Sequence, residues 1–115
     1  MSEAAVLRAI TDFLLYKGAL VLRINSGAAI AATPTGGRRF LSFVRWSALG
    51  VDEHRAGCSD LIAIFANKVF MIEVKAPGRR SNVSQAQALF LAEAEARGAV
   101  CVVATCIEDV EAALE

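Results

Sequence analysis

Histidine and cysteine are scarce in this sequence of 115 residues. It has one histidine, His54, and three cysteines, Cys58, Cys101 and Cys106. No two cysteines have CxxC spacing, and such a sparse, odd set is typical neither of a disulfide framework nor of a zinc site. We therefore expect free thiols in a reducing, cytoplasmic compartment. His54 is either an incidental loop residue or a substrate contact.

Long apolar runs are also missing. The longest apolar stretches, such as residues 99–105, are far shorter than the roughly 18 residues that a bilayer span needs. The first four residues contain no basic region that leads into an apolar stretch, so no secretory signal is expected. The sequence therefore predicts no membrane partner.

Net charge is absent, because twelve Lys and Arg balance twelve Asp and Glu. Nucleic-acid-binding domains usually have excess positive charge. The balance is nevertheless an average: residues 1–90 contain eleven basic and six acidic residues, whereas residues 91–115 contain one and six. We expect the basic and acidic regions on different faces, and DNA is not excluded as a partner.

The apolar content is high, at 56% with a mean hydropathy of +0.48, which excludes intrinsic disorder. The length suits one domain, residues 1–115. Apolar periodicity and the Gly, Pro and Ser positions predict the boundaries of the elements. We expect helices at 3–17, 84–97 and 107–114; strands at 19–24, 38–46, 60–65, 69–75 and 99–105; and loops at 25–37 and 47–59.

The predicted fold is α/β, a mixed β-sheet with flanking helices in the order αβ(β)ββαβα. Residues 60–65 and 69–75 are separated by a gap that is short enough only for an antiparallel hairpin. Both strands are apolar on both faces, so we expect this hairpin to be central and covered on each side. Ser84 and Gln87 are spaced as a capping box at the start of the second helix.

Asp60, Glu73 and Lys75 are the strongest candidates for chemistry. Glu73 and Lys75 are two residues apart on a strand, so they share a face. A two-residue turn at Ala66-Asn67 would place Asp60 opposite Glu73, whereas a three-residue turn would shift the register by one. The alternative is a structural salt bridge at the end of a strand.

Two facing carboxylates in an apolar sheet repel one another unless something compensates them. A divalent cation is one such compensation, and oxygen ligands with retained waters suit Mg²⁺ or Mn²⁺. A lysine beside the pair can hold a water or a phosphate oxygen. The set therefore suits metal-assisted hydrolysis of a phosphodiester.

An ordered set of motifs runs along most of the chain, from Glu3 to about Cys106. It consists of Glu3, Arg23-x-Asn25-Ser26-Gly27, Gly57-Cys-Ser-Asp60-Leu-Ile, Glu73-Val-Lys75, and Ser84-x-x-Gln87 with Phe90 three residues on. This set resembles the VRR-NUC family of the PD-(D/E)xK nuclease superfamily, which has a restriction-endonuclease-like fold. Cys58-Ser59 departs from the family pattern, which often has Val-Pro or Val-Ser there.

The resemblance implies the roles of the site residues. Asp60 and Glu73 bind the metal, with the Val74 carbonyl as a third ligand, and Lys75 is the catalytic lysine. Gln87 orients the attacking water or Lys75, or is only a capping residue. Two further motif positions have both a functional and a structural interpretation. Glu3 touches a metal or only favours a helix N-terminus, and Asn25 and Ser26 contact the site or the DNA backbone, or form an ordinary turn.

Arginines flank the proposed site in sequence and suit phosphate contacts that position a duplex. Arg79 and Arg80 are the better candidates, because they directly follow the strand of Glu73 and Lys75. The others can equally be solvated charges. They are Arg38, Arg39, Arg45 and Arg55.

Stand-alone members of the resembled family are similar to Holliday-junction resolvases and act as homodimers. The resemblance implies a DNA endonuclease that uses Mg²⁺ or Mn²⁺, cuts four-way or other branched DNA, and works in the cytoplasm of a bacterium or a phage-infected host cell. One alternative is a non-catalytic module that binds DNA structures. Another is a subunit of a larger replication or repair complex.

Overall fold

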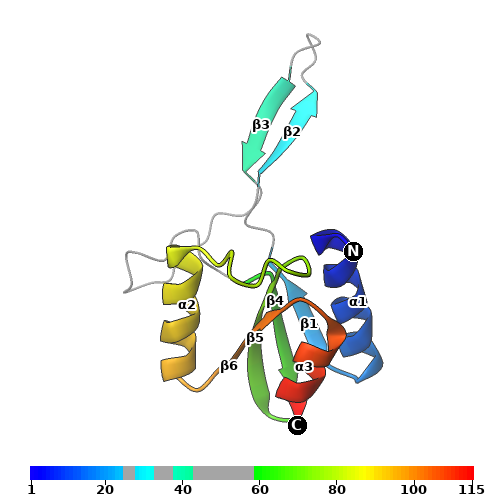
Figure 1. Cartoon of the computed structure of the whole chain (residues 1–115), viewed down its shortest axis with the longest axis vertical. Helices are drawn as coiled ribbons and strands as arrows, with labels where there is room; N and C mark the ends of the chain where they lie inside the picture. The colour runs from blue at the N-terminus through cyan, green and yellow to red at the C-terminus, as the bar shows by residue number, and fades with distance from the viewer. Residues whose placement is uncertain (25–27, 33–37, 43–58) are drawn as a thin grey trace.

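The computed structural model describes residues 1–24, 28–32, 38–42 and 59–115, which form three helices and six strands. Figure 1 shows their arrangement. The described elements, in chain order, are α1 (Glu3–Tyr16), β1 (Leu20–Arg23), β2 (Ala28–Ala32), β3 (Arg38–Ser42), β4 (Leu61–Phe65), β5 (Lys68–Val74), α2 (Gln85–Ala96), β6 (Val100–Ala104) and α3 (Ile107–Leu114).

Four strands form a mixed sheet in the order β1-β4-β5-β6. The pairs β1–β4 and β4–β5 are antiparallel, whereas β5 and β6 are parallel. Helix α2 supplies the crossover that parallel neighbours require. The C-terminal ends of β5 and β6 therefore lie at the same edge of the sheet, together with the first turn of α2. The predicted mixed α/β fold is confirmed.

The hairpin of β4 and β5 has a two-residue turn, which is one of the two alternatives that the sequence left open. Ala66 and Asn67 have positive φ angles of 52° and 65°, which is the backbone of a type I′ turn. Phe65 pairs with Lys68, and Leu61 pairs with Ile72. The same register, continued by one residue, brings Asp60 opposite Glu73.

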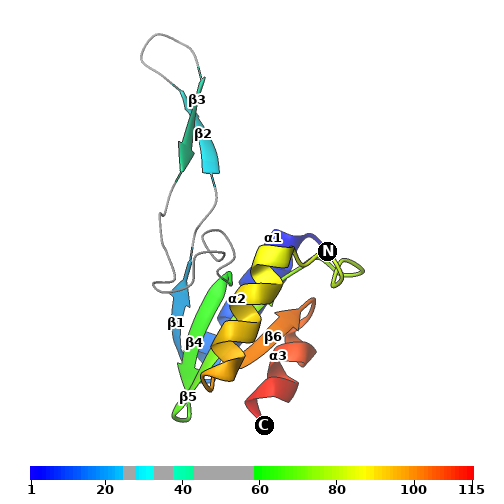
Figure 2. The ribbon, with the colours of Figure 1, turned by 90° about the vertical axis from the view of Figure 1, so that its left-hand side faces the viewer.

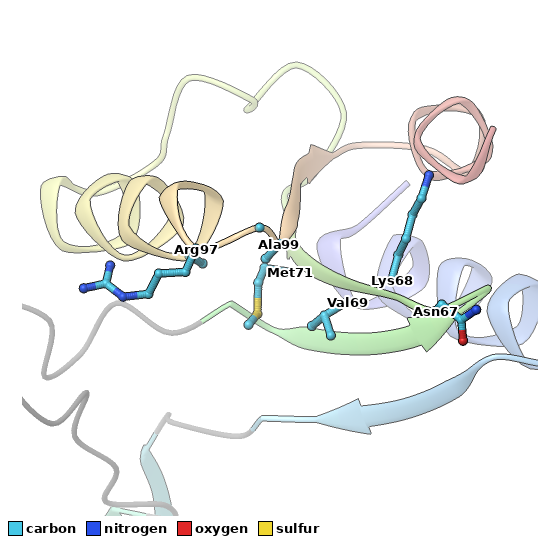
Figure 3. A pocket seen from close by; sticks show the side chains of 8 residues that line it. Asn67, Lys68, Val69, Met71, Arg97 and Ala99 are labelled. Carbon is cyan, nitrogen blue, oxygen red and sulfur yellow. The ribbon is translucent and has the colours of Figure 1, made fainter.

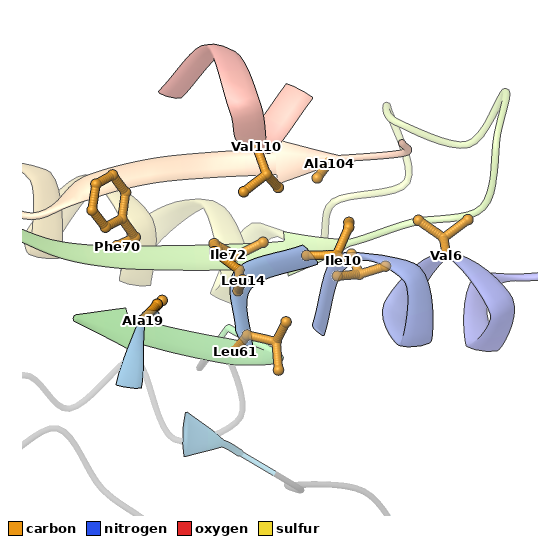
Figure 4. Packing of buried hydrophobic residues seen from close by; sticks show 11 residues of the cluster. Val6, Ile10, Leu14, Ala19, Leu61, Phe70, Ile72, Ala104 and Val110 are labelled. Atoms are coloured by element: carbon orange, nitrogen blue, oxygen red, sulfur yellow. The ribbon is translucent and has the colours of Figure 1, made fainter. Parts of the chain in front are cut away.

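The hydrophobic core lies on one face of the four-stranded sheet, under α1 and α3 (Figure 4). The expected helical repeat of α1 buries its apolar stripe, and α3 contributes Val110. The strands contribute alternate residues from β4 and β5. The fully buried members of these elements are Val6, Ile10, Leu14, Leu61, Ala63, Phe70, Ile72, Val74 and Val110.

The hairpin is central in the sheet, as predicted, but the described residues cover its second face only in part, which corrects the expectation of cover on each side. Ile64 and Val69 keep 42% and 38% of their surface exposed, and Leu20 and Leu22 of β1 keep 60% and 44%. Helix α2 lies on this face but has no buried residue. Its position toward β6 leaves the surface of β1 and β4 open among the described residues (Figure 2).

Strand β2 corrects a second prediction, since residues 25–37 were expected to be a loop. Residues 28–32 instead pair antiparallel with β3 in a separate two-stranded sheet. Residues 38–42 of the expected strand 38–46 are confirmed as β3. Residues 43–46 and nearly all of the expected loop at 47–59 lie outside the described part of the chain.

Both α1 and α2 begin at a serine cap, and the cap at Ser84 was predicted. Ser2 accepts a hydrogen bond from the Ala5 N–H, and Gly18 follows α1 with φ +88°. Ser84 caps α2 with a complete capping box. In the described residues, no helix has the length and apolar character that crossing a membrane would require.

Candidate active site

Asp60 and Glu73 meet at the edge where β5 ends. The Asp60 carbonyl accepts a hydrogen bond from the Ile24 N–H, which holds its backbone beside β1. One carboxylate oxygen of Asp60, Oδ2, accepts from the Val74 N–H at 2.8 Å. The side chain therefore crosses from the start of β4 to the backbone of β5, next to Glu73, and its second oxygen stays free of that backbone contact.

Glu73 is an acid in an apolar setting, with only 2% of its surface exposed. Burial, the charge of Asp60, the hydrogen bond that a protonated Glu73 donates to Asp60, and the charge of Glu3 together raise its pKa from 4.5 to about 8. Lys75 opposes the shift. When both carboxylates are ionised, the buried oxygen Glu73 Oε2 has no hydrogen-bond partner.

The other oxygen of Glu73 belongs to a polar cluster with Lys75 and Gln87. Gln87 Nε2 donates to Glu73 Oε1 at 2.9 Å, and Lys75 Nζ lies 3.7 Å from the same oxygen. Lys75 Nζ also donates to Gln87 Oε1 at 3.3 Å. The lysine ammonium, with 14% of its side chain exposed, is thus fixed between an amide and a carboxylate.

Gln87 makes the contacts that both sequence interpretations require. Its Oε1 accepts from the Ser84 N–H at 2.9 Å, and its own N–H donates to Ser84 Oγ at 3.1 Å, which makes the capping box. The same amide contacts Glu73 and Lys75. The cap therefore fixes the orientation of the amide that faces the two charged groups.

The remaining predicted ligands lie near this cluster. Glu3, in the first turn of α1, is close enough for its charge to act on Glu73. Val74 is buried and follows Glu73 directly, so its carbonyl belongs to the same edge. Within the described ranges, no three His, Cys, Asp or Glu side chains group so as to hold a metal ion.

Arg80 is engaged differently from the prediction. Its guanidinium donates to Asp109 Oδ2 at 2.6 Å, although it was expected to be a phosphate contact. This pair joins one basic residue of the first 90 residues to one acidic residue of the last 25. Arg79 is exposed, and its described hydrogen bonds are those of its backbone: its N–H donates to the Ala76 carbonyl, and its carbonyl accepts from the Asn82 N–H.

Asp109 and Thr105 form a second polar cluster at the same edge, which the sequence reasoning missed. Asp109 Oδ2 accepts from the Thr105 N–H at 2.9 Å and from Arg80. Burial opposes ionisation of Asp109, but these donors outweigh it and lower its pKa to about 2. An acidic residue in the first turn of a helix was the only sequence signal available.

Several predicted residues are not placed by the structure. Asn25 and Ser26 lie outside the described residues, as do Arg45 and Arg55. Arg38 and Arg39 are described only by their backbone, as the first two residues of β3.

A groove with a cavity of about 410 Å³ lies at the other end of α2 and β5. Its lining includes Val69 and Met71 from β5 and Ala94 near the end of α2. Figure 3 shows Lys68 and Arg97 on its two sides, with their side chains diverging. The groove contains no acidic lining residue, so it offers binding space but no group for acid, base or metal chemistry.

The carboxylate cluster, in contrast, has a donor set that fits a divalent cation. Two neighbouring carboxylates provide hard oxygen ligands, and buried Glu73 Oε2 needs either a proton or a cation. A cation would remove the repulsion between Asp60 and Glu73 and allow both to ionise at neutral pH. The residues therefore fit Mg²⁺ or Mn²⁺ with several retained waters.

Comparisons of this chain with protein-family models, with curated proteins and with solved structures found no match.

Proposed function

We propose that this chain is a metal-dependent DNA endonuclease that hydrolyses phosphodiesters with Mg²⁺ or Mn²⁺. The observation that carries the proposal is the buried oxygen Glu73 Oε2, which has no hydrogen-bond partner when the neighbouring carboxylates of Glu73 and Asp60 are both ionised. A buried anionic pair is costly in a protein without a ligand. The resemblance of the motifs to the VRR-NUC family supports metal binding as the function of that pair.

The metal would be held by Asp60, Glu73 and the Val74 carbonyl, with Glu3 within reach through water. When bound, the ion supplies polarisation of the scissile phosphate and a lowered pKa for a bound water. The burial of Glu73 keeps bulk water from its carboxylate, which strengthens ionic contacts there.

Lys75 positions a water or a phosphate oxygen, and Gln87 holds Lys75 in place. Lys75 Nζ is held by Gln87 Oε1 and by the charge of Glu73, so its remaining hydrogens can orient a water or a phosphate oxygen. Gln87 cannot turn its amide freely, because the Ser84 N–H holds Oε1. The ammonium is thereby presented in one orientation.

The substrate we propose is branched DNA, probed most directly with a four-way junction. Two symmetric cuts need two active sites, and a twofold homodimer supplies them. The exposed apolar side chains of Leu20, Leu22 and Ile64 support a subunit interface on the open face of the sheet. A restriction-endonuclease-like fold is supported by the mixed sheet with its α2 crossover, and a cytoplasmic location by the free thiols Cys101 and Cys106.

A fluorescent four-way junction, incubated with the purified protein in Mg²⁺, in Mn²⁺ or in EDTA, tests the proposal. We expect cutting with either metal and none in EDTA. Binding without cutting by a folded sample in all three conditions would favour the non-catalytic DNA-binding module instead. Activity of a monodisperse dimer by itself would argue against a role that requires a larger complex.

A further inference from the structure

Strands β2 and β3 form a two-stranded ribbon that is separate from the four-stranded sheet. Its register pairs Ile30 with Phe40, Ala31 with Arg39 and Ala32 with Arg38. In both overall views the ribbon stands away from the described helices (Figures 1 and 2). A two-stranded ribbon is only marginally stable by itself, so a surface that receives it is expected.

The segment that contains the ribbon is basic, whereas the acidic residues of the chain are concentrated in residues 91–115. Residues 24–51 contain three arginines and no Asp or Glu. Because the whole chain has no net charge, the remaining residues carry a net charge of −3. That negative charge comes from residues 91–115, which contain one basic and six acidic residues. The ribbon segment suits a polyanion because it contains arginines and no acid.

The register places Arg38 and Arg39 side by side at the start of β3, each opposite an alanine. Neighbouring residues of a strand fall on opposite faces, so each face of the ribbon carries one arginine position. A ribbon lying flat on a surface would use only one of them. A ribbon inside a groove would use both, and small residues opposite the arginines allow close approach.

We propose that the β2–β3 ribbon is a second DNA-binding element, which lies in a groove of duplex DNA and contacts the phosphates on both sides through Arg38 and Arg39. The proposal rests on the proposed function only in taking DNA as the ligand. The major groove, about 12 Å wide, admits a two-stranded ribbon, whose strands lie about 4.8 Å apart. Phosphate contacts of this kind position a duplex without reading its sequence.

The test measures binding of a labelled 20-base-pair duplex in EDTA over a range of salt concentrations, so that no cleavage is needed. The variants are Arg38→Ala, Arg39→Ala and both together. The matched control removes two exposed cations of α1 and its C-cap with Arg8→Ala and Lys17→Ala. A further double variant, Arg38→Lys with Arg39→Lys, keeps the charges, and thermal unfolding checks that every variant folds.

We expect each alanine variant to weaken binding about tenfold and to reduce by about one the slope of log binding constant against log salt concentration, the salt slope. The double variant should weaken binding about a hundredfold and reduce the salt slope by about two. The lysine variant and the α1 control keep slopes close to that of the wild type. If only one arginine affects the slope, the ribbon lies flat and the groove geometry is wrong. If neither does, or if the double alanine variant converts a dimer to a monomer, the ribbon is not a DNA-binding element.

These outcomes are separate from those of the proposed function. A protein that binds duplex DNA through the ribbon but never cuts DNA would overturn the nuclease proposal alone. A protein that cuts junctions while the arginine variants bind like the wild type would overturn the ribbon proposal alone.

Discussion

Helix α2 and strand β5 lie near each other at both of their ends, and each end has one lysine. Lys68 is the first residue of β5, and Lys75 directly follows its last residue. At the end where α2 begins, Lys75 contacts Gln87 and Glu73. At the end where α2 finishes, Lys68 borders the groove lined by Val69 and Met71. The first end is compact and charged, and the second is open and apolar.

This difference shows that the volume of a cavity and the reactivity of the side chains around it are separate properties. The groove has a cavity of about 410 Å³, but no acidic residue of the described chain lines it. The compact end holds a buried acid with a raised pKa and an oxygen without a partner. Titratable groups with strongly shifted pKa values cluster at functional sites. The following predictions test this contrast.

The largest expected effect separates the two lysines. We expect Lys75→Ala to lower junction cleavage by at least about a hundredfold, because it removes the ammonium that faces the carboxylates. Lys68→Ala, the matched change at the other end of the same hairpin strand, should leave the rate unchanged. Both variants should still bind the junction in EDTA. Wild-type cleavage by Lys75→Ala would contradict the role given to this lysine.

The second prediction concerns the stability of the metal-free protein against pH. The unfolded chain ionises Glu73 near pH 4.5 and the folded chain only near 8, so ionisation costs stability as the pH rises through that window, by roughly 1.4 kcal/mol per unit. Glu73→Gln removes this cost. We expect it to match the wild type near pH 4 and to be several kcal/mol more stable at pH 8.

Denaturant unfolding in EDTA measures this difference. Glu93→Gln, at the other end of α2, is the control, because its exposed pair with Arg97 is worth at most about 0.5 kcal/mol. Added Mg²⁺ should stabilise the wild type at pH 8 and leave Glu73→Gln unchanged. Parallel pH profiles for wild type and Glu73→Gln would show that the buried carboxyl is not perturbed.

The third prediction separates capping from positioning at the start of α2. Ser84→Ala removes the hydroxyl cap and should cost about 1 kcal/mol of stability, with cleavage reduced only slightly. Gln87→Ala also removes the contacts to Glu73 and Lys75, so we expect a similar stability loss and cleavage at least about tenfold lower. Gln85→Ala is the neighbouring control. Equal cleavage by the Ser84 and Gln87 variants would reduce Gln87 to a capping residue.

The smallest expected effect belongs to Asp109, whose pKa is shifted in the direction opposite to that of Glu73. Its stabilisation is complete above pH 3.8 and is lost as the pH falls through about 2. Because solvent screens the exposed partner Arg80, Asp109→Asn should lose only about 1 kcal/mol at pH 7. The variant should converge with the wild type below pH 2. Acid unfolding curves measure this, and a constant difference at all pH values would contradict it.

Local features of the site were predictable from the sequence, because they depend on residues close together in the chain. The turn at Ala66-Asn67 fixed the hairpin register, and with it the approach of Asp60 to Glu73. The capping box of Ser84 and Gln87 spans only one helical turn. In contrast, β2 was missed because an alanine-rich segment has weak strand propensity and pairs only when a partner strand is present.

What the sequence by itself determined is the order of the main elements and the choice of Asp60, Glu73, Lys75 and Gln87. The tertiary structure decided how deeply Glu73 is buried and that one of its oxygens has no partner. It also joined Gln87 to the carboxylate and Arg80 to Asp109 across long stretches of chain. Burial and long-range pairing depend on how distant elements pack, and side-chain chemistry depends on both.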